Sequence, residues 1–212
     1  VLEQRLAAIE GGIAALAVAS GMAAITYAIQ ALTQVGDNIV STSQLYGGTY
    51  NLFAHTLPRQ GVEVRMAAYD DYAGLEALID DKTKALFCES IGNPAGNVVD
   101  LQRLADIAHK HGVPLVVDNT VATPVLCRAF DHGADIVIHS LTKYIGGHGN
   151  ALGGAITDTG LYDWSNFANI FDDYKNQDVK LWGITQVKKK GLRDIGASLG
   201  PEAAHHLAVG SE

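Results

Sequence analysis

Cysteine occurs only twice among the 212 residues, as Cys88 and Cys127, and both lie in apolar stretches. Two such thiols do not make the disulfide framework of a small secreted domain, so we expect buried thiols in a reducing cytoplasm. We also find no arrangement typical of a signal peptide, and no apolar run of about 18 residues, the length that spans a bilayer. The sequence therefore favours a cytoplasmic protein without a membrane segment.

Basic residues are scarce, since 15 Lys and Arg stand against 23 Asp and Glu and give a formal net charge of -8. A surface for nucleic acid or an anionic membrane needs an excess of positive charge, so the composition argues against both partners. The only basic run, Lys188–Lys190, is typical of a solvated loop. Hydrophobic residues make up 48% of the chain, enough for a large buried core.

The chain has no internal repeat, and short apolar runs alternate with segments of helical period. This alternation predicts βαβ units, and hence an α/β fold with a mostly parallel sheet. Helices are expected at 21–33, 72–79 and 101–111, and another should follow a loop at 46–48. Strands are expected at 14–19, 37–41, 62–66, 85–88, 114–117 and 135–139.

The two ends and the last third of the chain are the least regular. The chain begins at Val1 without an initiator Met and stops at Ser211-Glu212 without a closing element, which suggests a piece of a longer protein. We expect the segment 161–192 to be a mobile loop region that leads out of the domain.

Polar side chains collect where the predicted strands end, which is the edge at which open α/β sheets bind ligands. The set combines an anion cradle, an aromatic ring, carboxylates and a lysine. Its members are Ser20–Met22, Tyr46, Glu89, Asn93, Asp118–Thr120 and Ser140–Lys143.

Each member has an ordinary structural explanation when taken alone. Ser20 is either the N-cap of a tight strand–helix turn or, with Gly21, part of a phosphate site at a helix N-terminus. Asp118 either pairs with a protonated ring nitrogen or caps the turn that follows it. Neither choice can be made from these residues alone.

Lys143 closes the run Ser140-Leu141-Thr142-Lys143. We expect Lys143 to be buried among apolar neighbours, which lowers the pKa of a lysine and lets it act as a nucleophile or base near neutrality. The run also matches the S-x-x-K motif of Ser–Lys hydrolases, but their partner motifs S-D-N and K-T-G are absent. The glycines at 146–149 do not follow a strand, as a dinucleotide loop would, and the eight histidines show no metal-ligand spacing.

Five motifs occur in one order: VASGMAAI (18–25), LYGGTYNLF (45–53), ESIGNPAGNVVD (89–100), VVDNTVATP (116–124) and HSLTKYIGGHGNALGGAI (139–156). Together they resemble the Cys/Met metabolism family of pyridoxal 5′-phosphate (PLP) enzymes. The resemblance implies the aspartate aminotransferase type I fold, whose large domain has a mostly parallel seven-stranded sheet between helices. Within the family, the motifs are most similar to the O-acetylhomoserine sulfhydrylases. Val121 is a departure, because those enzymes tend to have an aromatic residue there.

The resemblance implies a role for each matched residue. Lys143 corresponds to the lysine that binds PLP as a Schiff base, and Asp118 to the partner of the pyridinium nitrogen. Tyr46 corresponds to the stacked ring, with a possible acid–base role, and Asn93 to the donor to the phenolic oxygen. The catalytic residues would thus be Lys143, Tyr46 and Asp118. The phosphate cradle would be Ser20, Gly21, Met22, Ser140 and Thr142.

The implied reaction belongs to methionine biosynthesis and replaces the acetate of O-acetylhomoserine with sulfide, free or on a carrier protein, to give homocysteine. The family is usually a homotetramer. The alternatives are a cystathionine γ-synthase or a γ- or β-lyase of the same family, or a catalytically silent fragment.

The resemblance also divides the chain into a PLP-binding large domain, 1–195, and the start of a connection to a C-terminal domain, 196–212. The family completes its site with a Tyr and an Arg from a neighbouring subunit's N-terminal segment and with an Arg from the C-terminal domain. All three fall outside this sequence, so we expect the chain alone to bind PLP weakly and to turn over poorly.

Overall fold

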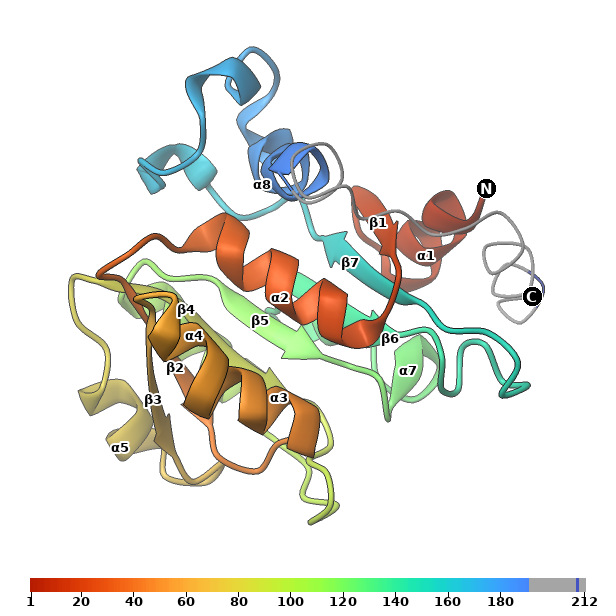
Figure 1. Ribbon diagram of the computed structural model, residues 1–212, viewed down its shortest axis with the longest axis horizontal. Helices are drawn as coiled ribbons and strands as arrows, with labels where there is room; N and C mark the ends of the chain where they lie inside the picture. The colour runs from red at the N-terminus through yellow and green to blue at the C-terminus, as the bar shows by residue number, and fades with distance from the viewer. Residues whose placement is uncertain (191–208, 210–212) are drawn as a thin grey trace.

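The computed structural model describes residues 1–190 and 209, which hold one seven-stranded sheet with helices on both faces (Figure 1). The strands are β1 (Ala14–Val18), β2 (Asn38–Thr42), β3 (Glu63–Ala67), β4 (Thr83–Glu89), β5 (Leu115–Asp118), β6 (Ile136–Ser140) and β7 (Gly154–Asp158). The α-helices are α1 (Leu2–Glu10), α2 (Gly21–Leu32), α3 (Gly47–Asn51), α4 (Leu57–Arg59), α5 (Tyr72–Ala77), α6 (Leu101–Lys110), α7 (Thr123–Leu126) and α8 (Trp182–Val187).

The strand order is β1-β7-β6-β5-β4-β2-β3, and only β7 runs antiparallel to its neighbours, β1 and β6. The predicted mostly parallel, seven-stranded sheet is therefore confirmed. Six strands lie within two residues of their expected positions. The seventh, β7, was not predicted; it follows directly on a glycine-rich loop and pairs with β1, about 140 positions earlier.

Side chains alternate across the sheet and divide the core into two layers. The layer under α2 contains Leu16, Phe87, Val116 and Ile138, and α2 crosses the front of the sheet in Figure 1. The opposite layer packs against α5 and α6 over most of the sheet and against α1 beside β1 and β7. Both faces are covered, as expected for parallel strands that are apolar on both sides.

Local signals explain the two best-predicted helices. Ser20 caps α2 by accepting a hydrogen bond from the backbone N–H of Ala23 at 3.0 Å. Asp100 caps α6 in the same way through Arg103, and α6 ends just before Gly112, whose φ of +69° suits glycine.

The helix expected after a loop at 46–48 begins earlier. Gly47 and Gly48 form the first turn of α3, which continues through a π-helical segment, Leu52–Thr56, into α4. Among the described residues, no helix is long and apolar enough to cross a membrane. Both cysteines are free thiols; Cys88 is buried as expected, whereas Cys127 is only half-buried.

The segment after β7 does not lead out of the domain as a loop, so that expectation is wrong for its described part, up to residue 190. Trp164, Phe167, Ile170 and Tyr174 are all buried in the layer under α2, where α8 also packs. Residues 191–192 and the expected boundary between 195 and 196 lie outside the described residues.

Candidate active site

A cavity of about 630 Å³ opens at the carboxyl ends of β4, β5 and β6, beside the N-terminus of α2. The nine residues to which the family resemblance gave a role all line it: Ser20, Gly21, Met22, Tyr46, Asn93, Asp118, Ser140, Thr142 and Lys143. Further lining residues had no assigned role, among them Glu89, Thr120, Val121, Tyr144 and Leu152. The sheet therefore brings together segments that are more than a hundred residues apart in sequence.

The N-terminus of α2 forms one end of the cavity. The hydroxyl of Ser20 already caps the helix, whereas the N–H groups of Gly21 and Met22, in the first turn, have no intrahelical acceptor. A Cβ atom at Gly21 would lie 2.7 Å from the Cβ of Ser140, so only glycine lets the turn approach β6 this closely. The turn is thus both a capped helix start and a place where an anion can meet free N–H groups.

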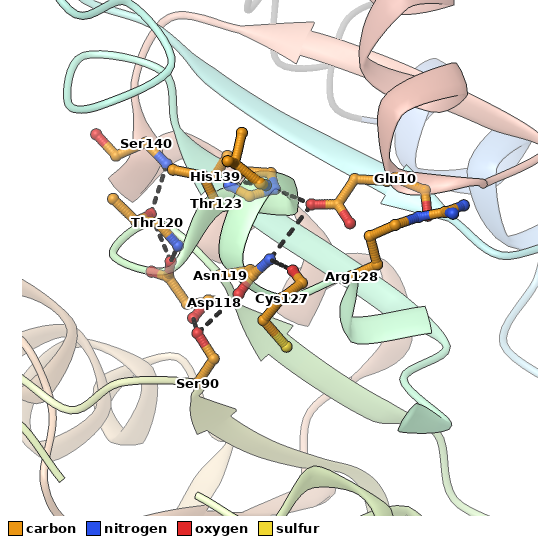
Figure 2. A network of polar contacts seen from close by, with 11 residues as sticks. Glu10, Ser90, Asp118, Asn119, Thr120, Thr123, Cys127, Arg128, His139 and Ser140 are labelled. Atoms are coloured by element: carbon orange, nitrogen blue, oxygen red, sulfur yellow. Dashed lines mark hydrogen bonds and ion pairs between the residues drawn. The ribbon is translucent and has the colours of Figure 1, made fainter. Parts of the chain in front are cut away.

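Asp118 is the last residue of β5, and its carboxylate is held by Thr120 (Figure 2). Asp118 Oδ1 accepts hydrogen bonds from the Thr120 hydroxyl at 2.5 Å and from the Thr120 N–H at 3.0 Å. The Thr120 hydroxyl in turn accepts the N–H of Ser140 at 2.8 Å, which couples the ends of β5 and β6. Burial raises the pKa of the Asp118 carboxyl, whereas the Thr120 bonds and the charge of His139 lower it.

Glu89 also lines the cavity, although the sequence motifs gave it no role. It lies beside Asp118 in the register of β4 and β5 and is 5% exposed. Its carboxylate accepts the N–H of Tyr46 at 2.6 Å and that of Asn93 at 3.2 Å. Burial raises the pKa of Glu89 to about 7, and the charge of Asp118 adds to the effect. The sequence signal for a role of Glu89 was its position as an acidic residue at the end of an apolar strand.

Tyr46 precedes α3, and its ring lies close to Gly48 and Met22. A Cβ atom at Gly48 would be 2.7 Å from ring atom Cε1 of Tyr46 and 3.1 Å from the Met22 sulfur. The ring is half-exposed at 48% and borders the cavity. It therefore presents an aromatic surface to a ligand in the cavity.

Lys143 follows β6 in a turn whose backbone is fixed by Lys143 N–H to Ser140 O at 3.2 Å and by Gly147 N–H to Lys143 O at 2.8 Å. Its side chain is exposed at the cavity, so the expected burial among apolar neighbours is wrong. No hydrogen bond joins Lys143 to Ser140 through their side chains, which is the pairing that a Ser–Lys hydrolase needs.

The polar groups that line the cavity suit a flat, anionic ligand with a basic ring nitrogen and a carbonyl group. An anion fits against the free N–H groups of α2, the carboxylate of Asp118 can pair with the nitrogen, and the amine of Lys143 can react with the carbonyl. Tyr46 offers a ring for stacking.

The sequence model of the family described as Cys/Met metabolism PLP-dependent enzyme matches residues 1–212. The chain is 46% identical over 225 residues to the homocysteine/cysteine synthase of Saccharomyces cerevisiae, with 100% of the chain and 51% of that protein covered. It is 40% identical over 230 residues to the O-acetyl-L-homoserine sulfhydrylase of Leptospira meyeri, with 100% and 52% covered. The chain thus spans about half the length of the curated relatives it matches.

Two solved structures share the fold. An O-acetylhomoserine sulfhydrylase of Wolinella succinogenes superposes with a TM-score of 0.92 at 39% identity, over 100% of this chain and 60% of that one. A Campylobacter jejuni protein that contains N′-pyridoxyl-lysine-5′-monophosphate gives a TM-score of 0.91 at 40% identity, over 99% and 55%.

Proposed function

The chain belongs to the Cys/Met metabolism family of PLP-dependent enzymes, and we propose that its cavity holds PLP and that the whole protein is an O-acetylhomoserine sulfhydrylase. The reaction is a γ-replacement in methionine biosynthesis: acetate leaves Cγ of O-acetylhomoserine, and sulfide, free or on a carrier protein, adds there to give homocysteine. The names of relatives that match the chain over its full length support this choice.

One observation carries the proposal: Lys143, Asp118 and the N-terminus of α2 line the same cavity. When bound, PLP supplies an electron sink for the substrate Cα. Asp118 pairs with the ring nitrogen and keeps it protonated. The N–H groups of Gly21 and Met22 bind the phosphate, with Ser20, Ser140 and Thr142 around them.

The remaining residues act on the ring and on the substrate. Lys143 would hold the cofactor covalently, and its free amine would move protons at the substrate Cα and Cβ. Tyr46 would stack on the ring of the cofactor and would assist the leaving group as an acid–base residue. Asn93 donates to the phenolic oxygen of the cofactor.

The organisation of the whole protein is also a proposal. Residues 1–195 form the PLP-binding large domain and 196–212 begin a connection to a C-terminal domain, although that boundary lies outside the described residues. A homotetramer, with phosphate contacts from a neighbouring subunit, and a cytoplasmic location complete the proposal; the two free thiols are consistent with a reducing compartment.

The decisive experiment on the cofactor adds PLP to the intact protein, reduces with borohydride and maps the modified residue. We expect a visible absorption band and label on Lys143, and neither in Lys143→Ala. Label scattered over surface lysines would overturn the assignment of the site. A second assay compares homocysteine formation from O-acetylhomoserine and sulfide with elimination of methionine and cystathionine. Faster elimination would assign a lyase instead.

A further inference from the structure

The carboxyl ends of the adjacent strands β4, β5 and β6 carry polar residues on both faces of the sheet. Glu89, Asp118 and Ser140 line the cavity, and each has a polar neighbour in sequence that points away from it: Ser90, Asn119 and His139. This follows from the alternation of side chains along a strand. Behind the cavity, those three neighbours and Glu10 form a buried group that we name the back layer (Figure 2).

Glu10 is the last residue of α1 and is fully buried. Its Oε1 atom is hydrogen-bonded to Nε2 of His139, which is 1% exposed. The same oxygen is 3.5 Å from the amide nitrogen of Asn119, a donor 109 positions away in the sequence. The other oxygen, Oε2, has no hydrogen-bond partner among the described residues, so His139 is the main partner of this carboxylate.

Asn119 connects the back layer to the end of β4 and to the turn after α7. Its Oδ1 accepts the Ser90 hydroxyl at 2.8 Å, and its amide donates to the carbonyl of Cys127 at 2.7 Å. The Ser90 N–H also donates to the backbone carbonyl of Asp118 at 3.0 Å. The amide of Asn119 thus reaches three elements and leaves the ends of β4 and β5 little freedom.

A carboxylate buried at this depth is costly unless it is paired, and the helix could end on any apolar residue if its only task were to pack. Both groups that contact the Glu10 carboxylate lie one residue from a residue lining the cavity: Asn119 follows Asp118, and His139 precedes Ser140. A shift of either neighbour would move a cavity side chain with it.

We propose that Glu10 is a positioning residue that, through His139 and Asn119, fixes Asp118 and Ser140 in the arrangement that binds the cofactor. This inference rests on the proposed binding of PLP in the cavity. Glu10 does not touch the cavity, and its effect passes through the backbone of β5 and β6. The helix α1 is thereby part of the site's support and not only a cover for β1 and β7.

The test is Glu10→Gln in the intact protein, with Glu3→Gln as the matched control. Glu3 lies on the same helix and accepts the N–H of Ala17 at 3.0 Å, on β1 and not on β5 or β6. Gln keeps the shape of Glu10 and can still accept hydrogen bonds at Oε1, but it removes the negative charge of the carboxylate that faces His139 and Asn119. Because Glu10 acts on the cavity only through the backbone of β5 and β6, we expect the affinity for PLP to fall about tenfold, which corresponds to about 1.4 kcal/mol.

Three readouts separate positioning from folding: PLP affinity, the visible spectrum of the bound cofactor, and thermal unfolding of the cofactor-free protein. Glu10→Gln should weaken PLP binding and change the spectrum, whereas Glu3→Gln should lower thermal stability at most. If Glu10→Gln does not fold, Ser90→Ala, which removes one anchor of Asn119, should give the same change to a smaller degree.

The outcomes for the inference and for the proposed function are distinct. If the wild-type protein carries no PLP on Lys143, the proposed function fails. If it does carry PLP and Glu10→Gln binds it with the affinity and spectrum of Glu3→Gln, only the positioning role of Glu10 is overturned.

Discussion

The two carboxylate oxygens of Glu89 accept hydrogen bonds from the backbone N–H groups of Tyr46 and Asn93, which lie on different loops at the cavity. A backbone N–H contact fixes the main chain of its partner, and the side chain follows. Glu89 can therefore hold an aromatic ring and an amide in place without contacting either side chain. Its effect does not depend on the identity of the loop residues.

Glu89→Gln should weaken cofactor binding, because the amide group of Gln can accept only one of the two N–H groups and sets a donor against the other. Above about pH 7, where Glu89 is ionised, a lost hydrogen bond to this charged acceptor corresponds to roughly tenfold or more in affinity, since it contributes about 1.5–3 kcal/mol. Titration of the PLP-free variant with PLP measures the change. Glu63→Gln, on the edge strand β3, is the control and should leave affinity unchanged. Equal affinity in both variants would show that Glu89 does not fix the two loops.

Among the elements, the antiparallel strand β7 ends in a buried acidic residue, Asp158. Asp158 ends this strand, is 1% exposed and lies between Ala14 of β1 and Ile136 of β6. Its Oδ1 accepts the N–H of Gly160 at 2.8 Å. Burial raises the pKa of Asp158 to about 7, and the hydrogen bond from the backbone of Gly160 opposes this rise.

The raised pKa predicts a stability change with pH. Near pH 4 and below, Asp158 is protonated in the folded chain and its ionisation does not penalise folding. As the pH rises from there to about 7, the unfolded chain releases the proton first, so this carboxyl destabilises the fold progressively. Asp158→Asn removes the ionisation, so its stability relative to the wild type should rise over that pH window and then level off.

Denaturant unfolding at a series of pH values measures this difference. Asp70→Asn, at an exposed position, is the control and should show no such slope. A constant difference between Asp158→Asn and the wild type from pH 4 to pH 8 would contradict the prediction.

The elements that the sequence predicted well have local causes. The helices α2 and α6 carry their caps at Ser20 and Asp100, and the central strands are continuous apolar runs. The strand β7 was missed because its identity depends on antiparallel pairing with β1, about 140 positions earlier. Local pattern does not contain such a pairing.

The site divides in the same way. The nine lining residues were found from their motifs, and the sheet brings all of them to one cavity. The hydrogen bonds of Glu89 and the pairing of Glu10 with His139 were not found, because both depend on strand register and on contacts 43 and 129 positions apart. The exposure of Lys143 was also missed, since its neighbours Leu141 and Ile145 are buried and it is not.

For the whole molecule, the segment after β7 is part of the main core. Trp164 is fully buried, and a Cβ atom at Gly183 of α8 would lie 2.5 Å from its ring. The ring also packs against Tyr162 and Phe167, with centroids 4.6 and 5.3 Å away. This aromatic group joins the segment to α8 and to the sheet.

Trp164→Ala should destabilise the fold by about 3–5 kcal/mol, because it removes a large buried ring and leaves a cavity. Urea unfolding followed by circular dichroism measures the loss. Leu161→Ala is the control, since Leu161 is 81% exposed in the same segment and should cost less than about 0.5 kcal/mol. A small loss in Trp164→Ala would mean that the segment is not bound into the core.

The alternation of cavity-facing and rear-facing residues also decides which changes in chain length this protein can tolerate. Deleting or inserting a single residue at the end of β4, β5 or β6 would rotate the next side chain to the other side of the sheet. At β5, Asn119 would then face the cofactor and Asp118 would face α1. Insertions and deletions are therefore tolerated in the loops beyond the strand ends. The pairs Glu89-Ser90, Asp118-Asn119 and His139-Ser140 can change only by substitution.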